Sequence, residues 1–406
     1  MRLLARVTGQ KASILQALAA IGTGLASERT YFDWNATAPL RPEARAAMLA
    51  ALDASGNASS VHGEGRTARQ RVEAARRRVA ALVGGAKVNQ VTFVSGATEA
   101  NALALQPGIA DRLFVSAVEH PSVLAGGRFA QEQVEILPVD GNGIVDLDAL
   151  AGALVMAERP LVSVMLANNE IGVIQPIAEI GAIVHAANGL LHVDAVQAAG
   201  RIPVDMRALG ADLMSLSSHK IGGPQGAGAL IVDSDQNLKP LIRGGGQERG
   251  LRAGTENVAA IAGFGAAAEA ALAGLDAEAG RMAALRERLE GGLRAATPDA
   301  IIFAHGVGRL PNTTLVAVPG VKAETALIAF DLNGFALSSG AACSSGKVAA
   351  SHVLAAMGVE PALARGAIRI SLGPSTLDSE VESLLIAWKR LVPSLLKGQS
   401  DQHLAA

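Results

Sequence analysis

The chain of 406 residues has only one cysteine, Cys343. A single cysteine cannot form an intramolecular disulfide, so a disulfide-stapled secreted domain is excluded and a reducing compartment such as the cytoplasm is expected. The thiol is then either a small buried side chain or a reactive nucleophile.

The chain also lacks an excess of basic charge and a long apolar run. Lysine and arginine number 35, aspartate and glutamate number 37, and the formal net charge is -2. This balance argues against nucleic acid as a partner. No uninterrupted apolar stretch reaches the ~18 residues of a membrane span, so no membrane partner is expected either. Small molecules and proteins remain as the expected partners.

The first thirty residues form an extension whose role the sequence leaves open. Arg2, Arg6 and Lys11 precede the apolar residues 14–26 without an acidic residue among them, a pattern that faintly resembles a signal or transit peptide. The alternatives are an amphipathic helix and a start codon placed too early.

Half of the residues are hydrophobic, which is enough for a large core and roughly two or three domains. Short apolar runs alternate with helical stretches, as in a mostly parallel sheet buried on both faces. The runs are 91–94, 113–118, 161–166, 190–193, 212–217 and 227–232. The sequence therefore predicts an α/β fold.

Residues 257–296 are rich in Ala, Leu, Glu and Arg at helical spacing, and they predict a long helix or helix pair that links two domains. The predicted elements after it are strands at 301–303, 314–318 and 368–371 and a helix at 377–392. These elements indicate a smaller α+β domain. The expected division is an extension at 1–30, a large domain at 31–275, whose first residues join the small domain, and a small domain at 276–406.

Polar residues follow three of the predicted strands, at 95–99, at Asp194 and at 217–220. Ligands of parallel sheets bind beyond the carboxyl ends of the strands, so these groups are expected to share one site. Residues 217–220 read Ser-Ser-His-Lys and lead into a glycine-rich run. A lysine in this place suits a Schiff base with pyridoxal phosphate, although lysines near glycine-rich loops are common.

Two further segments suit the same cofactor. Residues 95–101, Ser-Gly-Ala-Thr-Glu-Ala-Asn, place the free amides of a helix N-terminus after a strand, as either an anion site or an ordinary helix cap. Asp194 ends a buried strand and needs a cation, which is either a protonated pyridine nitrogen or an Arg or Lys side chain. Gln197 would face the same site if a helix starts there.

Other candidates keep two interpretations each. His120, fixed by Pro121, can stack on a ring and move protons, although a lone histidine is more often structural. Arg369 suits either the carboxylate of an amino acid substrate or a buried ion pair with Asp or Glu. The glycine-rich turn at 244–257 is either a phosphate contact or a flexible loop.

Cys343 lies among small residues only, at 338–346. A core cysteine normally has large apolar neighbours, so this segment indicates a mobile loop whose thiol can travel. The intrinsic pKa of a thiol, about 8.5, leaves a minor thiolate fraction at neutral pH unless a positive neighbour lowers it. The alternative is an inert loop cysteine.

Together these segments resemble the cysteine desulfurases of the NifS/IscS type, within the class V aminotransferase group of fold-type I pyridoxal phosphate enzymes. The matching motifs, in family order, are YFDWNATAP (31–39), NASSVHGEGR (57–66), SGATEAN (95–101), EHPSV (119–123), NNEIGVIQP (168–176), HVDAVQ (192–197), SSHKIGGPQGAGAL (217–230), GGGQERGLRAGTENV (244–258), SSGAACSSGK (338–347) and RISLG (369–373).

The resemblance implies a large domain with a mainly parallel seven-stranded sheet flanked by helices, a smaller α+β domain and a homodimer. Lys220 would bind the cofactor, Asp194 would pair with its pyridine nitrogen and His120 would stack on its ring. The other implied cofactor contacts are Ala97, Thr98, Asn169, Gln197, Ser217, His219 and, toward the phosphate of the neighbouring subunit, Thr255. Asn35, Asn169 and Arg369 would lie near the substrate, and no metal is expected.

The reaction that the resemblance implies converts L-cysteine to L-alanine. Lys220 would move a proton from Cα, and the Cys343 thiolate would take the substrate sulfur as a persulfide for an acceptor such as an iron-sulfur scaffold protein. Residues 397–406 do not match the tail through which some members dock that scaffold. The alternatives are another class V enzyme, such as an aminotransferase or selenocysteine lyase, and a non-catalytic sulfur-assembly scaffold.

Overall fold

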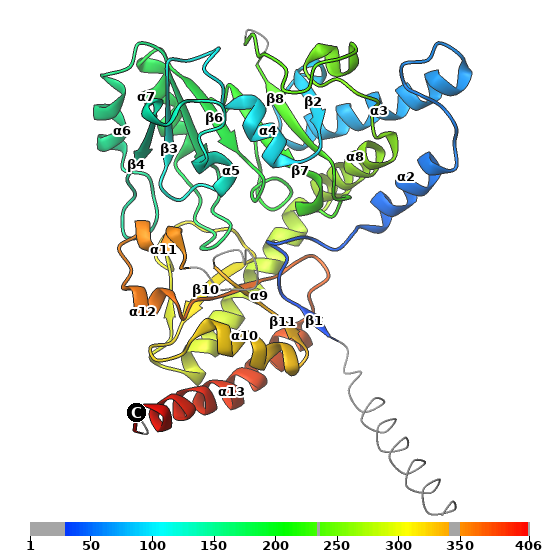
Figure 1. Ribbon diagram of the computed structural model, residues 1–406. Coiled ribbons are helices and arrows are strands. Elements are labelled where there is room, and N and C mark those ends of the chain that lie inside the picture. Colours follow the sequence, from blue (N-terminus) through cyan, green and yellow to red (C-terminus); the bar gives the residue numbers. More distant parts are fainter. Residues whose placement is uncertain (1–28, 234–235, 341–349, 405–406) are drawn as a thin grey trace, which may run out of the picture.

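The computed structural model describes residues 29–233, 236–340 and 350–404, with side chains described as far as residue 396. Cys343 and nearly all of the predicted N-terminal extension fall outside these ranges. The described strands form a large sheet of seven strands, a small sheet of four and a pair of two. Figure 1 shows the elements around them.

The large sheet has seven strands, of which only β8 runs against its neighbours. They are β2 (Val91–Val94), β3 (Arg112–Ser116), β4 (Val134–Leu137), β5 (Pro160–Met165), β6 (Leu190–Asp194), β7 (Leu213–Ser217) and β8 (Gly228–Val232). Their spatial order is β2-β8-β7-β6-β5-β3-β4, and β8 is antiparallel to both β2 and β7. The predicted mainly parallel seven-stranded sheet is confirmed.

Six of these strands coincide with the predicted apolar runs, and β4 does not. Glu135 interrupts its apolar sequence, and Ile136 is 51% exposed because β4 is the edge strand beside β3. An edge strand with one open face lacks the continuous apolar run that marks a strand covered on both faces. The missed strand is therefore a consequence of its position in the sheet.

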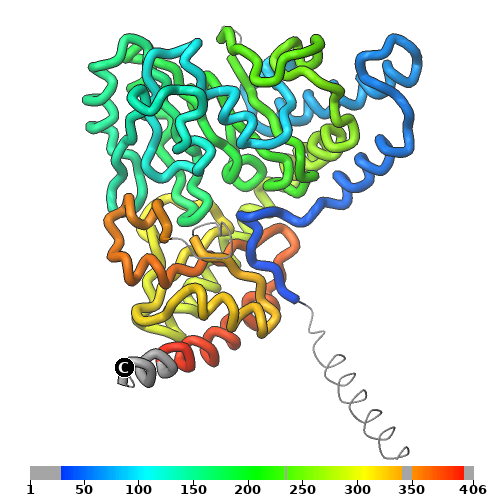
Figure 2. The backbone as a smooth tube through the Cα atoms, viewed as in Figure 1, coloured from blue at the N-terminus to red at the C-terminus, as the bar shows by residue number. Residues whose placement is uncertain are grey.

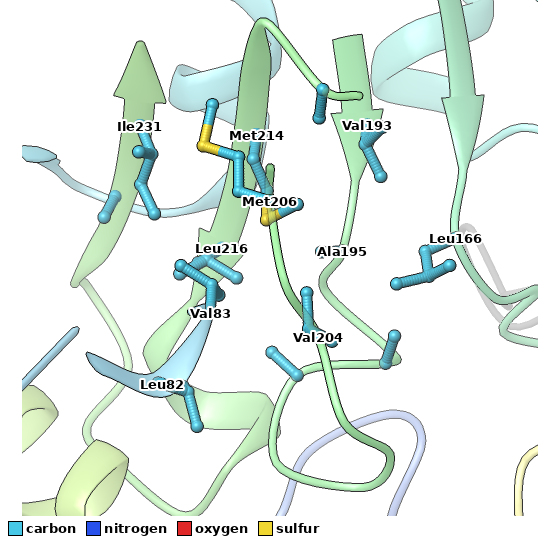
Figure 3. Close-up of a cluster of buried hydrophobic side chains, with 14 of the residues drawn as sticks. Leu82, Val83, Leu166, Val193, Ala195, Val204, Met206, Met214, Leu216 and Ile231 are labelled. Carbon is cyan, nitrogen blue, oxygen red and sulfur yellow. The ribbon is translucent and has the colours of Figure 1, made fainter. Parts of the chain in front are cut away.

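Alternate residues of the strands enter two hydrophobic clusters, one on each face of the sheet. Val91 and Phe93 of β2 belong to one cluster, and Val94 belongs to the other. Figure 3 shows part of the first cluster, in which Val193, Met214 and other strand residues pack together. The helices that cover this face are α3 (Gly63–Leu82), α6 (Leu147–Leu154), α7 (Ile177–Ala186) and α8 (Val258–Ala273). The opposite face packs on α4 (Ala97–Ala104) and α5 (Pro121–Leu124).

The small sheet is antiparallel and contains residues from distant parts of the chain. Its strands are β9 (Ile301–Ile302), β10 (Thr313–Ala317), β12 (Ser338–Ser339) and β13 (Ile368–Ser371), in the order β12-β13-β10-β9. The N-terminal strand β1 (Thr30–Tyr31) pairs in parallel with β11 (Phe335–Ala336). Figure 2 shows this blue N-terminal segment beside the later part of the chain. The first described residues thus lie beside residues 335–336, and the predicted division into domains stays a prediction.

The core of this second group is rich in aromatic residues. Phe330 and Trp388 are fully buried and stack with ring centroids 5.7 Å apart. The other described α-helices are α2 (Pro42–Leu52), α9 (Leu275–Ala296), α10 (Ala323–Leu332), α11 (His352–Ala356), α12 (Pro361–Ala364) and α13 (Asp378–Leu404). The short 3-10 turns are η1 (Val88–Gln90), η2 (Gln131–Gln133), η3 (Ser218–Lys220) and η4 (Gln247–Gly250).

The predicted connecting segment is a helix pair. Helices α8 and α9 meet at Gly274 and are bent by 71° with respect to each other. Within the described residues no single helix has the length and apolar composition of a membrane span, and this bent pair alone passes that test when joined. The domain boundary predicted at residue 275 stays a prediction, and it lies beside this bend.

Candidate active site

The polar residues predicted to share a site lie at one edge of the large sheet. Asp194 ends β6 and Ser217 ends β7, and these neighbouring strands are parallel. Ser95 follows β2, which runs in the same direction because β8 is antiparallel to both of its neighbours. Three strand ends therefore present polar groups at the edge where parallel sheets bind ligands.

Lys220 lies in η3, immediately after β7. Its Nζ donates hydrogen bonds to the backbone carbonyls of Asn35 (2.5 Å) and Ala36 (2.8 Å). Burial, together with the nearby cations Arg201 and Arg369, lowers the pKa of Lys220 to about 7. A substantial fraction of the amine is therefore neutral near physiological pH, as a nucleophile that forms a Schiff base requires.

Asp194 is a buried carboxylate held by neutral donors. It is 5% exposed and accepts hydrogen bonds from Asn101 Nδ2 (3.0 Å) and from the backbone N–H of Val196 (3.1 Å). Among the described side chains no Lys or Arg forms an ion pair with it. The structure therefore does not show the Arg or Lys partner that the sequence left open for Asp194. With neutral donors only, the Asp194 carboxylate remains able to pair with a protonated ring nitrogen.

The N-terminus of α4 has free backbone amides. No side chain caps this helix, whose first residues are Ala97 and Thr98. A Cβ added to Gly228 would lie 2.7 Å from Gly96, so the start of β8 approaches the residue before α4 closely. Gly228 in turn pairs with Ser217 across β7 and β8. Uncapped helix amides beside a serine suit a phosphate, and the side-chain-capped alternative is not observed.

His219 is a neutral imidazole in the same region. Burial and the cations Lys220 and Arg201 lower the pKa of His219 to about 4. Its Nδ1 lies 3.1 Å from Thr37 Oγ1. A neutral imidazole always carries one N–H, so His219 can donate to an anion without adding a buried charge.

Glu99 is the only acidic residue of the motif at 95–101, and it lies in the first turn of α4. Its carboxylate accepts from Ser95 N (2.8 Å) and from Arg252 Nε (3.1 Å). Burial raises the pKa of Glu99, but the bonds from Ser95 and Arg252 outweigh burial and lower it overall. The negative charge is therefore balanced by Arg252, a residue of the glycine-rich turn that the sequence left without a role.

His120 caps α5 and belongs to a hydrogen-bonded chain. Its Nδ1 lies 2.8 Å from Ser122 Oγ and accepts from Ser122 N at 3.1 Å. Asn101 Nδ2 donates to Ser122 Oγ (2.9 Å) and also to Asp194 Oδ2 (3.0 Å). The histidine and the carboxylate predicted to contact one cofactor are therefore connected through two polar side chains.

A second histidine approaches His120 from the small sheet's side of the protein. His352, the first residue of α11, lies with Nε2 2.9 Å from the backbone carbonyl of Glu119, so this nitrogen is the donor. Burial lowers the pKa of His120, and the nearby Lys220 and His352 lower it further against the effect of Asp194. The sequence motifs gave no sign of His352, because it lies within residues 348–368, between the last two matched motifs.

Arg369 forms the buried ion pair that the sequence left as an alternative to substrate binding. Its Nη2 donates to Asp33 Oδ1 (2.7 Å) and its Nη1 to the backbone carbonyl of Asn169 (3.0 Å). Its Nε is buried without a partner among the described residues. The side chain therefore keeps an unused donor, and the ion pair does not rule out a role toward a substrate carboxylate.

Asn35 reaches the site through its backbone. Its side chain donates to the carbonyl of Asn169 (3.1 Å) and to Thr313 Oγ1 (2.9 Å), and it is 1% exposed. Its own carbonyl accepts from Lys220 and from Gln197 Nε2 (3.0 Å). The Asn35 carbonyl thus holds the side chains of Lys220 and Gln197 in place. The predicted contact of Asn35 with the substrate stays a prediction.

Arg201 is a buried cation that the sequence did not single out. It is 6% exposed and donates to the carbonyls of Gln197, Trp34 and Lys220 and to Oε1 of Gln197, and no carboxylate among the described residues pairs with it. Burial, and to a lesser degree Arg369, lowers the pKa of Arg201 to about 10. It lines a cavity of about 300 Å³ that also adjoins Lys220. Its contact with Oε1 leaves the amide nitrogen of Gln197 directed to Asn35.

The glycine-rich turn at 244–257 is anchored at one buried residue. Glu248 accepts from Arg76 Nη1 (2.6 Å), from Arg76 Nη2 (2.9 Å) and from Phe93 N (2.8 Å). Thr255, farther along the turn, is exposed. Glu248 is therefore fixed in place. Whether the turn is a phosphate contact or a flexible loop, and the contact of Thr255 with a neighbouring subunit, stay predictions.

Cys343 lies outside the described residues, so the structure places its two flanks only. Within those described ranges, no group of three or more His, Cys, Asp or Glu side chains is arranged to hold a metal ion.

Comparison with known proteins gives one consistent result. The sequence model of the family described as Aminotransferase class-V matches residues 30–384. The chain is 43% identical to a protein named cysteine desulfurase from Cereibacter sphaeroides, over 91% of this chain and 97% of the relative. It is 40% identical to a protein named cysteine desulfurase IscS from Dictyoglomus turgidum, over 90% of this chain and 95% of the relative.

Solved structures resemble the chain to the same extent. A NifS-like protein from Rickettsia africae superposes with a TM-score of 0.84 at 37% identity, covering 90% of this chain and 99% of that chain. Another structure titled NifS-like protein gives a TM-score of 0.81 at 35% identity, covering 90% of this chain and all of the other.

Proposed function

The chain belongs to the class-V aminotransferase family, and from that premise we propose that it is a cysteine desulfurase. It converts L-cysteine to L-alanine and takes up the sulfur as a persulfide on Cys343 for delivery to an acceptor. Its cofactor is pyridoxal phosphate.

The described residues fit this cofactor group by group. Asp194 offers a buried carboxylate for a protonated ring nitrogen, because its other contacts are neutral. The uncapped N-terminus of α4 and the neutral His219 offer N–H donors for the phosphate. Gln197 is held by Arg201 and donates one N–H of its amide to the Asn35 carbonyl, which leaves the second N–H for the cofactor. When bound, the cofactor supplies an electron sink for the charge that develops at Cα of an amino acid.

Lys220 is the residue that handles the proton at Cα. Its amine, with a pKa of about 7, exists in both protonation states near neutral pH and can therefore accept and return a proton. Backbone carbonyls of Asn35 and Ala36 hold it in place between these steps. Arg369, with its unused Nε–H, binds the substrate carboxylate next to Asp33 and orients Cα.

Cys343 supplies the sulfur nucleophile. Its thiolate attacks the sulfur of the substrate, a new S–S bond forms, and the C–S bond of the substrate breaks with its electron pair left on carbon. A proton on that carbon completes alanine, and Cys343 carries the persulfide. His120 lies at the same sheet edge as Lys220 and donates a proton in this part of the reaction once its imidazole has taken one up.

The observation that carries this proposal is the convergence of Lys220, Asp194 and His120 at one sheet edge in a chain 40% to 43% identical to proteins named cysteine desulfurase. The test loads the purified protein with pyridoxal phosphate, adds L-cysteine and measures alanine and the mass of the Cys343 peptide. We expect equal amounts of alanine and transferable sulfur, with one sulfur atom added to Cys343.

The variant Cys343→Ala separates this function from its rivals. It keeps the visible absorbance of the bound cofactor but loses sulfur transfer, because only the nucleophile is removed. Undiminished turnover of L-cysteine in this variant would instead favour another class V activity, such as that of an aminotransferase or a selenocysteine lyase. A colourless protein that takes up no cofactor would favour a non-catalytic scaffold.

We further propose that the enzyme works as a homodimer in the cytoplasm and passes sulfur to an acceptor such as an iron-sulfur scaffold protein. A free thiol nucleophile requires a reducing compartment. Helix α2 leaves Leu49 and Leu52 exposed, and Val61 nearby in the chain is 87% exposed, which suits burial against a second copy. Light scattering tests the dimer: we expect twice the 41.2 kDa of one chain, and the mass of a monomer would contradict it.

A further inference from the structure

Asn101 is a buried amide whose orientation is determined by its neighbours. Its Nδ2 donates to Asp194 Oδ2 (3.0 Å) and to Ser122 Oγ (2.9 Å), whereas its Oδ1 is buried without a partner among the described residues. The opposite amide orientation would direct a carbonyl oxygen at the Asp194 carboxylate. An amide that leaves its own acceptor unused is therefore placed for its two donor bonds.

The direction of these bonds determines where the proton of Ser122 lies. Because Ser122 Oγ accepts a hydrogen from Asn101, its own hydroxyl hydrogen is free to point at His120 Nδ1, which is 2.8 Å away. The backbone N–H of Ser122 points at the same nitrogen from 3.1 Å. Two donors thus meet at His120 Nδ1, so this nitrogen is an acceptor and carries no hydrogen.

We propose that Asn101 and Ser122 are positioning residues that hold His120 as a neutral imidazole with its proton on Nε2 and couple its orientation to Asp194. His120 then offers a hydrogen-bond donor at Nε2, and no described residue accepts a hydrogen bond from that nitrogen. It takes up a proton at Nδ1 only after the Ser122 hydroxyl has turned away. The proposal rests on the proposed function only in that it takes His120 and Asp194 as members of the cofactor site.

The hydrogen bonds through Asn101 and Ser122 also couple His120 to the charge near Asp194. A positive charge placed next to Asp194 changes the strength of the hydrogen bond from Asn101 to Asp194. The same nitrogen of Asn101 also donates to Ser122. Binding of the cofactor beside Asp194 is therefore coupled to the strength of the hydrogen bond at His120. This coupling is what distinguishes a positioning role from simple packing.

The test observes the tautomer directly in the full-length protein loaded with pyridoxal phosphate. Histidine labelled with ¹⁵N reports which ring nitrogen carries the proton, and His120→Gln assigns the signal among the eight histidines. We expect the proton on Nε2 in the wild type. In Ser122→Ala one of the two donors to Nδ1 is lost, so the pH at which His120 is half protonated rises by on the order of half a unit.

Asn101→Leu tests the coupling to Asp194. We expect the half-saturating concentration of pyridoxal phosphate to rise about tenfold, because a charged group loses one hydrogen bond. The control is Ser383→Ala on exposed α13, which should change neither value. A proton on Nδ1 in the wild type would overturn the proposal, as would an unchanged His120 titration in both site variants. Alanine formation by the wild type is measured in the same preparations, so a failure of the proposed function shows separately.

Discussion

Ser351 donates a hydrogen bond of 2.6 Å to Oε2 of Glu170, joining residues 181 positions apart. Glu170 is 2% exposed, and burial raises its pKa against the effects of Ser351, His352 and Arg369. A Cβ added to Gly340 would lie 2.5 Å from the same oxygen. Glu170 therefore contacts one residue on each side of the segment that contains Cys343, at 340 and 351.

Replacing Ser351 with alanine removes a buried donor and leaves the Glu170 carboxyl without its hydroxyl partner. The hydroxyl also accepts the capping bond from Leu354 N at 3.0 Å, so both contacts are lost. We expect the free energy of unfolding to fall by about 2 kcal/mol, measured by urea denaturation. Ser383→Ala, at an exposed position, is the matched control with an expected change within about 0.5 kcal/mol. Equal stability of the two variants would show that the Glu170 contact contributes nothing.

Uptake of pyridoxal phosphate by the cofactor-free protein should follow the neutral fraction of Lys220. Burial and neighbouring cations lower the pKa of this lysine to about 7, so the uptake rate should rise about tenfold per pH unit below that value and level off above it. Absorbance of the bound cofactor measures the rate. Arg201→Met removes a buried cation and should move the midpoint to higher pH, whereas Arg128→Met, an exposed position, should not. A wild-type midpoint near that of free lysine would refute the lowered pKa.

Arg369→Lys keeps a positive charge beside Asp33 but removes the planar set of donors. We expect KM for L-cysteine to rise about tenfold or more with a smaller change in kcat, because hydrogen bonds to a charged carboxylate contribute about 1.5–3 kcal/mol. Steady-state alanine formation measures both constants. Arg365→Lys, on the exposed end of α12, is the control. An unchanged KM would mean that Arg369 serves only its ion pair with Asp33.

Glu119 should make the protein less stable as the pH rises. Burial raises the pKa of its carboxyl well above the usual value, the negative charge of Asp194 adds to this, and the bond from Met165 N opposes it. The folded state therefore holds the proton more tightly than the unfolded state. The stability from this group is complete below the pKa of the unfolded chain and is lost as the pH rises toward the pKa of the folded state.

Glu119→Gln stays neutral at every pH. Its advantage over the wild type should therefore grow with pH by up to about 1.4 kcal/mol per unit, as measured by urea denaturation between pH 5 and 8. Glu132→Gln, an exposed position, controls for loss of charge alone. A pH-independent difference would show that Glu119 is ionised in the folded protein.

Much of the site was predictable because its residues occupy local sequence patterns. Lys220, Asp194 and Ser95 follow apolar runs, and the ends of parallel strands must lie at one edge. The helix pair at 257–296 was predictable from helical spacing, and its bend coincides with Gly274. Strand β4 was not, since its exposed face at the sheet edge hides the apolar pattern.

The sequence by itself determined the α/β class and the positions of Lys220 and Asp194 at strand ends, because burial on both faces of a sheet leaves a continuous apolar signature and strand ends follow from it. The tertiary structure alone decided how the charges are paired. Arg369 meets Asp33 across 336 positions, and Arg201 meets carbonyls rather than a carboxylate. Such contacts join segments with no sequence periodicity in common, and they set whether a buried group is charged, which atom carries a proton and which donor remains free.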